Sequence, residues 1–206
     1  MDTKKAYLKF EAEVSLENEA LVKRFNHLAM KRTTQLNPRP CSHEPRTFIN
    51  NWYFDVRPIT LPFGPHETFP AEMLVIFNGS SRRFHAEGPF RVFDDTRADP
   101  DSLKRKAEWI AKLLVRAFAK QSRMEATGIF SPGSRRTVPW TWSTGDERVR
   151  SAIQDALRAL GVRQQLCTVG LEGPLGSDRR MADEQWTSIR DALIIEVGKI
   201  PDPRNH

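Results

Sequence analysis

Met73-Leu74-Val75-Ile76-Phe77 is a continuous apolar run in the first half of the 206-residue chain. A run without a polar face is typical of a strand that is covered on both sides. Asn78-Gly79 follows it directly, and this dipeptide signals a tight turn between antiparallel strands. We therefore expect a central strand at 73–77 that pairs with an antiparallel neighbour.

The flanking sequence adds strands on both sides of this run. Upstream, within residues 48–56, apolar side chains recur at every second position from Trp52 to Val56, which predicts a half-buried strand. Downstream, Phe84 and Ala86 share a strand face, Gly88-Pro89 interrupts the strand, and residues 90–93 resume it. Residues 48–93 therefore predict an antiparallel meander of three or four strands.

The N-terminal segment predicts one strand and one helix. Residues 8–14 alternate between apolar and charged side chains, which is typical of a half-buried strand. Ser15 then offers an N-cap, and apolar residues recur at helical spacing from Leu16 to Lys31. Residues 33–47 are rich in proline and poor in apolar residues, so we expect a loop there.

The second half of the chain predicts three further helices. The longest covers residues 100–123, with Asp99-Pro100 at its start, and a loop at 125–138 and an extended segment at 139–142 follow. Thr144 and Glu147 have the spacing of a capping box, which begins a helix that ends near Leu160. Gly161 is predicted as the C′ residue that ends this helix. A strand at 166–171, a loop at 173–180 and a final helix at 182–197 are expected to follow.

The expected fold class is α+β. Neighbouring strands without intervening helices argue against a purely parallel sheet. We expect a mixed or mainly antiparallel sheet of about four to six strands, with three main helices packed on it. Residues 1–200 are expected to form a single domain, within which 139–200 could be a C-terminal β-α-β-α subdomain, and 201–206 a frayed tail.

Composition excludes several classes of protein. No apolar run approaches the ~20 residues that span a bilayer, and the charged N-terminal residues lack the apolar core of a signal peptide. We therefore expect an intracellular protein, cytoplasmic or nuclear, without a membrane partner. Two cysteines cannot form a disulfide framework or a four-cysteine zinc site, and no phosphate-binding glycine motif is present. No metal or cofactor is predicted.

The net charge of +6 is concentrated in one stretch. Between Lys104 and Arg136, only Glu108 and Glu125 oppose nine basic residues. The favoured interpretation is the solvated face of a helix, because such helices are common. The alternative is an anionic partner, for which we expect weak, non-specific polyanion binding that salt abolishes. The residues on this face are Lys104, Arg105, Lys112, Arg116 and Lys120.

A pattern within residues 139–169 resembles a C-terminal region of uncharacterised fungal proteins, some of which also carry a MYND-type zinc finger. The residues that carry the resemblance are Trp140-Thr141-Trp142, Asp146, Leu160-Gly161-Val162-Arg163 and Leu166-Cys167-Thr168-Val169. This chain lacks the paired cysteines of that finger. The resemblance therefore implies neither zinc binding nor the finger's partner recruitment, and it implies no activity.

Three loops end in paired arginines that could clamp an anion. Glycine and serine let the backbone approach an anion, and arginine can bind two of its oxygens. If the loops converged, they would form a phosphate or carboxylate site, but ordinary exposed turns have the same composition, and this alternative is favoured. The candidate residues are Arg82, Arg83, Arg135, Arg136, Arg179 and Arg180.

Three further groups of side chains are candidates. Trp140 and Trp142 share one face of an extended segment and could contact an aromatic ligand, although core anchors are the favoured interpretation. His85 and Glu87 can share a strand face, where a carboxylate orients an imidazole for general-base chemistry. His43 lies in the run Cys41-Ser42-His43-Glu44 and is a second candidate base.

These observations favour a non-catalytic interaction or regulatory module, with a protein partner or a second copy of the chain. The motivation is that the chain shows no recognisable pair of nucleophile and base, metal set or cofactor loop. One alternative is an enzyme acting on an anionic small molecule, with the arginine-ended loops as a clamp and His85 or His43 as base. The other alternative is a weak nucleic-acid-binding protein.

Overall fold

The computed structural model of the protein describes residues 12–14, 18–29, 32–34, 47–62, 68–79, 83–93, 100–119, 139–173 and 175–198. Within them, the main sheet contains five strands in the order β5-β4-β3-β6-β7. β3, β4 and β5 are antiparallel, whereas β6 and β7 run parallel to β3, so the sheet is mixed and the expected α+β class is confirmed. The bounds are β3 (Asn51–Pro62), β4 (Thr68–Asn78), β5 (Arg83–Arg91), β6 (Thr141–Thr144) and β7 (Val169–Leu171).

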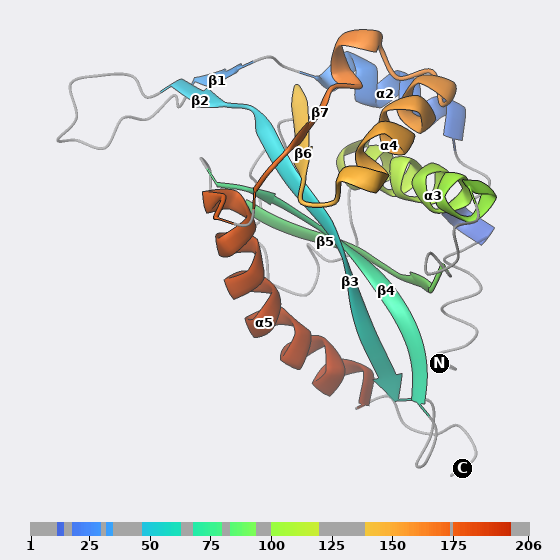
Figure 1. Ribbon diagram of the computed structural model, residues 1–206, viewed down its shortest axis with the longest axis vertical. Helices are drawn as coiled ribbons and strands as arrows, with labels where there is room; N and C mark the ends of the chain where they lie inside the picture. Colours follow the sequence, from blue (N-terminus) through green and yellow to red (C-terminus); the bar gives the residue numbers. More distant parts are fainter. Residues whose placement is uncertain are drawn as a thin grey trace, which may run out of the picture.

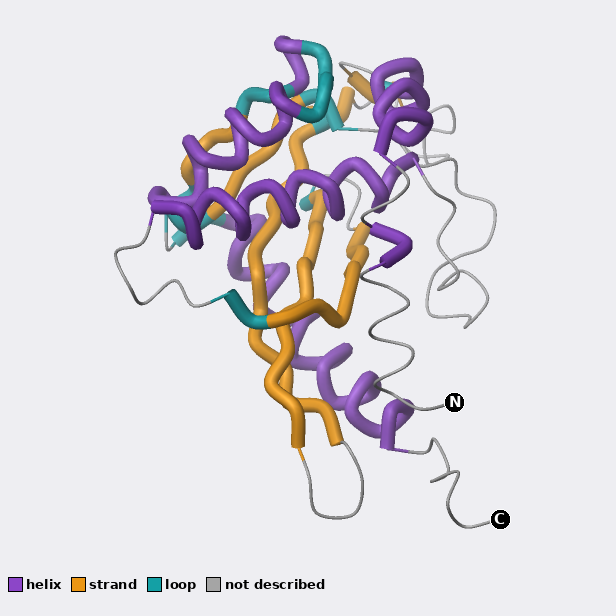
Figure 2. The backbone as a smooth tube through the Cα atoms, turned by 90° about the vertical axis from the view of Figure 1, so that its right-hand side faces the viewer, coloured by secondary structure: helices purple, strands orange, loops and turns teal. Residues whose placement is uncertain are grey.

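In the described part of the chain, four long helices accompany the sheet, which matches the four helical segments predicted from the sequence. Three of them lie on one side of the sheet, and α5 covers the other side (Figure 1). Figure 2 shows the strands between these two layers. The helix bounds are α2 (Asn18–Leu28), α3 (Pro100–Ala119), α4 (Glu147–Ala159) and α5 (Ser177–Gly198).

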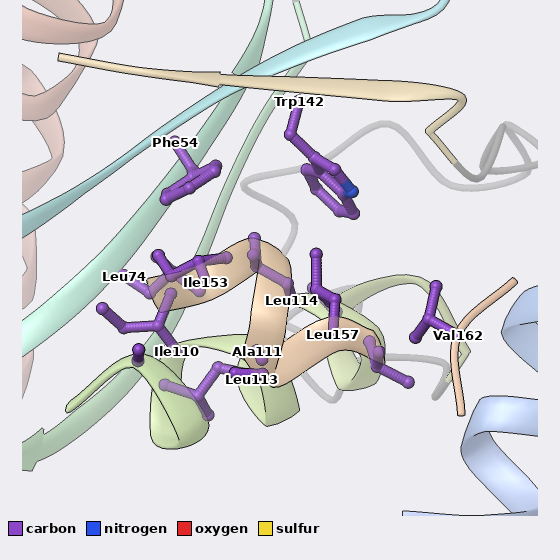
Figure 3. Packing of buried hydrophobic residues seen from close by; sticks show 14 of the residues in the cluster. Phe54, Leu74, Ile110, Ala111, Leu113, Leu114, Trp142, Ile153, Leu157 and Val162 are labelled. Carbon is purple, nitrogen blue, oxygen red and sulfur yellow. The ribbon is translucent and has the colours of Figure 1, made fainter. Parts of the chain in front are cut away.

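The alternation of side chains along β3 and β4 supplies a core on each side of the sheet. Trp52 and Phe54 pack in the cluster that α2, α3 and α4 cover, whereas Tyr53 packs in the cluster that α5 covers. The expected central strand, Met73–Phe77, lies within β4 and is buried on both faces. Figure 3 shows Phe54 and Trp142 pointing from the sheet toward α3 and α4.

The strands extend further than the pattern predicted. β3 continues through Pro58 to Pro62, because beyond Phe54 it has a sheet neighbour on one side only and a missing N–H is tolerated there. β5 runs without a break through Gly88-Pro89, where the register shifts opposite Glu72 and Leu74. The interruption expected at this dipeptide is therefore a bulge within one strand.

Two predictions near the N-terminus were wrong where the structure describes them. Residues 12–14 are helical, not a strand: Val14 packs into the core and the Glu13 carboxylate accepts a hydrogen bond from Arg116 on α3, so contacts with a helix override the alternating pattern. In the expected loop, β1 (Arg32–Thr34) pairs with β2 (Thr47–Ile49). The expected strand at 8–11 and N-cap at Ser15 lie outside the described residues, as does the tail at 201–206.

The starts of α4 and α5 also differ from the prediction. Asp146, not Thr144, caps α4, with its side chain accepting a hydrogen bond from the Arg148 N–H at 2.9 Å. Thr144 cannot take this role because it still pairs with β3 and β7 as the last residue of β6. The expected strand at 166–171 is divided between a 3-10 helix (Gln164–Leu166) and β7, and α5 begins at Ser177 within the expected loop.

Replacing Gly88 with alanine is expected to lower the free energy of unfolding by about 1–3 kcal/mol, because Gly88 has a φ of +138° that side-chain-bearing residues rarely adopt. An added Cβ would also lie 3.1 Å from the Glu72 carbonyl oxygen. Urea unfolding followed by circular dichroism measures the change. Gly173→Ala is the control, because its Cβ would enter open space. An equal loss of stability in both variants would mean that the backbone at Gly88 does not require glycine.

Candidate functional site

The predicted acid–base pair, His85 and Glu87, lies on the face of β5 that α3 covers. His85 Nε2 is 2.8 Å from Glu87 Oε1, and the two residues are 6% and 8% exposed. Arg116 Nε on α3 lies 3.6 Å from the other Glu87 oxygen and its Nη2 lies 3.2 Å from Glu13 Oε2. The sequence therefore placed the two side chains together correctly, but they form part of a buried charge network that ties β5 to α3.

The basic face of α3 is smaller than the pattern indicated. Lys104 and Arg105 are exposed and Lys112 is half-buried, but Arg116 turns inward to Glu87. Lys106 is buried as well, with its Nζ 3.2 Å from Glu72 Oε1 on β4. Lys120 and the rest of the basic stretch up to Arg136 lie outside the described residues.

Two of the three arginine-ended loops meet at the start of α5. The Gly79 N–H donates to the Asp178 carboxylate, and a side chain on Gly79 would displace this carboxylate. The contact thus joins the loops through an acidic group instead of an arginine pair. Arg83 belongs to β5, and Arg179 and Arg180 belong to the first turn of α5; Arg82, Arg135, Arg136 and the candidate base His43 lie outside the described residues.

A carboxylate of the chain itself occupies the N-terminus of α5. Glu172 Oε1 accepts hydrogen bonds from the N–H groups of Asp178 at 3.0 Å and Arg179 at 3.1 Å, and Glu172 Oε2 accepts one from Ser143 Oγ at 3.3 Å. Burial, with a contribution from Glu172, raises the pKa of Asp178. The backbone groups that could receive an external anion therefore already bind Glu172.

A polar seam holds α5 against β3. Tyr53 donates to Asp55 Oδ2 at 3.2 Å, and Arg57 Nη2 lies 3.0 Å from the same oxygen while also contacting Asp183 on α5. Burial raises the pKa of both Tyr53 and Asp55. Since Arg57 is shared between Asp55 on β3 and Asp183 on α5, this seam is an ion-pair network that links the helix to the strand.

Trp140 and Trp142 both pack against the core beneath α3 and α4. Trp142 is 1% exposed, its ring stacks on Phe25 at a centroid distance of 6.1 Å, and its Nε1 donates to the Leu166 carbonyl at 3.1 Å. Trp140 is half-buried against the same cluster. Trp142 therefore has no surface for a ligand, in agreement with the favoured interpretation that the pair are core anchors.

The outer edge of β7 is the strongest candidate for a binding site. β7 ends the sheet, and toward β6 the Thr168 carbonyl accepts from the Trp142 N–H at 3.1 Å while the Glu172 N–H donates to the Thr144 carbonyl at 2.9 Å. Because alternate residues of a strand direct their backbone groups to opposite sides, Val169 and Leu171 present theirs on the outer edge. Leu171 is 46% exposed and Leu175, just beyond the strand, is 85% exposed.

This edge was not predicted from the sequence. The expected strand at 166–171 included the right residues, but the alternation of side chains does not reveal which strand ends a sheet. Leu175 was the available signal, since it is an apolar residue within the glycine- and charge-rich segment 173–180.

The described residues do not form a reactive cysteine site or a metal site. Cys167 is buried, its thiol donates to the Arg163 carbonyl at 3.4 Å, and burial raises its pKa. No group of three or more His, Cys, Asp or Glu side chains in the described ranges is placed to hold a metal ion, and none of the described helices combines the length and apolar character needed to cross a membrane.

No protein-family model and no curated protein matches the chain, so the resemblance of residues 139–169 stays a prediction.

Proposed function

We propose that the protein is an interaction module that binds an extended segment of a partner protein along the outer edge of β7. The observation that carries this proposal is the position of β7 at the end of the sheet with Leu171 and Leu175 exposed beside it. An edge strand offers unpaired backbone groups to a further strand, and apolar side chains along it add buried area and selectivity.

The two ends of the sheet differ in a way that supports this choice. β5, at the opposite end, carries Pro89 and a bulge, which are features that prevent a further strand from pairing. β7 carries neither, and on its outer edge the Val169 N–H donates to Gln154 Oε1 of α4 at 3.5 Å while Val169 itself is 4% exposed. Within the described residues this hydrogen bond involves Val169 and not Leu171, which is 46% exposed.

The proposal predicts that blocking the edge removes binding without unfolding the protein. Leu171→Pro deletes an outward N–H but keeps the backbone bonds to β6, because those involve Thr168 and Glu172. Leu175→Asp places a charge on the exposed apolar surface. Peptides selected by phage display against the wild-type protein are expected to bind both variants at least about tenfold more weakly, measured by isothermal titration calorimetry.

Val92→Asp is the matched control, because Val92 is 49% exposed and belongs to the segment that follows β5. It is expected to bind the selected peptides as the wild type does. Circular dichroism must show that all variants remain folded. Equal binding to the wild type, both edge variants and the control would contradict the proposal, as would a selection that yields no binding peptide.

The other two interpretations stay predictions. An enzyme acting on an anionic small molecule would need access to His85, which is buried beside Glu87, or a role for His43 outside the described residues. Weak nucleic-acid binding would rest on Lys104 and Arg105, the exposed part of the α3 face.

A further inference from the structure

One side of α4 faces the outer edge of β7. Gln154 identifies this side, because its Oε1 reaches the Val169 N–H. Side chains four residues apart share a helix face, so Arg150 and Arg158 lie on the same side as Gln154. The side of α4 beside β7 therefore carries an arginine one turn before Gln154 and another one turn after it.

Arg150 lies level with Leu171 along the strand. α4 connects the parallel strands β6 and β7, so it runs antiparallel to both, as Figure 1 shows. Four residues of a helix rise ~6 Å and two residues of a strand span ~6.6 Å. Since Gln154 is opposite Val169, Arg150 is opposite Leu171.

Arg150 differs from its basic neighbours in having an unsatisfied group. Its Nε is buried and has no acceptor among the described residues. By contrast, Arg148 is paired with Asp146 at 3.3 Å and Arg158 with Asp155 at 2.7 Å. This Nε is closed to solvent, so a partner would contact the terminal Nη groups of the half-buried Arg150 side chain, and a carboxylate is the acceptor that arginine binds best.

Leu171 and Arg150 would contact the same residues of an added strand. Val169 packs in the core that α4 covers, so Leu171, two positions later, has its side chain on the same face of the sheet. A segment paired with β7 would place alternate side chains on this face, beside both Leu171 and Arg150. The surface thus combines one apolar and one cationic contact.

We propose that the segment bound along β7 carries an aspartate or glutamate whose carboxylate pairs with Arg150. This inference rests on the proposed function and names the chemistry of its partner: an acidic, extended protein segment. A nucleic acid fits less well, because Glu147 and Asp155 on α4 are exposed near this flank and would repel a polyanion, whereas one carboxylate matches one unsatisfied arginine.

The test uses two labelled peptides of about ten residues with valine at every second position and serine at the others, in which one central valine is replaced by glutamate or by glutamine. Fluorescence anisotropy compares their binding to the wild type, Arg150→Gln, Arg158→Gln and Leu171→Pro. The glutamate peptide is expected to bind the wild type at least about tenfold more tightly than the glutamine peptide. Arg150→Gln should remove this preference, Arg158→Gln should keep it, and Leu171→Pro should weaken both peptides.

The outcomes separate the inference from the proposed function. If the wild type binds the glutamate and glutamine peptides equally, or Arg150→Gln keeps the preference, the acidic partner is wrong while the effect of Leu171→Pro still supports the edge. If Leu171→Pro changes nothing, or neither peptide binds, both proposals fail. Binding of a single-stranded oligonucleotide that requires Arg150, or self-association in sedimentation that Leu171→Pro abolishes, would assign another occupant and overturn the inference.

Discussion

Replacing Trp142 with alanine is expected to lower the free energy of unfolding by about 3–5 kcal/mol, the usual range for a buried aromatic residue. Trp142 lies at the centre of an aromatic cluster, with ring centroids 5.7 Å from Phe118 and 6.2 Å from Phe54. The substitution would also leave the Leu166 carbonyl without the indole N–H that it accepts. Urea unfolding followed by far-ultraviolet circular dichroism measures the loss without depending on tryptophan fluorescence.

Trp140 provides the matched control. It is two residues away but half-buried at the margin of the same cluster, so Trp140→Ala is expected to cost clearly less than Trp142→Ala. Trp142→Phe should recover part of the loss, because the ring is kept and the hydrogen bond is not. An equal cost for Trp140→Ala and Trp142→Ala would mean that Trp142 does not anchor the core.

The sequence predicted those parts of the fold whose signal is local. The apolar run in β4 and the helical spacing in α3 and α4 each identify an element within its own residues. The errors arose where a residue outside the element determines its secondary structure. Ser177–Arg180 read as a loop because the carboxylate that caps α5 comes from Glu172, before the helix begins. Residues 12–14 are helical because they dock on α3.

The candidate binding edge was less predictable than the fold. The sequence can show that residues near 169–171 form a strand, but whether that strand ends the sheet depends on the pairing of β6 with β3, which lie far apart in the chain. The role of Arg150 could not be predicted from the sequence either, since an arginine at this position of a helix is usually a solvated residue. Its unsatisfied Nε is visible only once α4 is placed beside β7.

The ion pair between Lys106 and Glu72 was not predicted from the sequence either. Lys106 lies at the margin of the polar face of the helix, where a lysine is usually solvated. Both side chains are buried, and Lys106→Met would remove the ammonium group 3.2 Å from the Glu72 carboxylate. Removing one partner of a buried pair is expected to cost about 3–5 kcal/mol, because the desolvated Glu72 carboxylate loses the cation that lies 3.2 Å from Oε1. Urea unfolding at neutral pH measures this loss.

The double variant Glu72→Leu with Lys106→Met distinguishes a lost ion pair from lost packing. When both charges are removed, no buried charge of this pair remains, so the double variant is expected to be more stable than Lys106→Met alone. Lys104→Met is the control on the same helix: Lys104 is exposed, and its replacement should change the stability by less than about 0.5 kcal/mol. If the double variant is instead destabilised by the sum of the losses of Glu72→Leu and Lys106→Met, the two side chains do not stabilise each other, and other contacts hold α3 to β4.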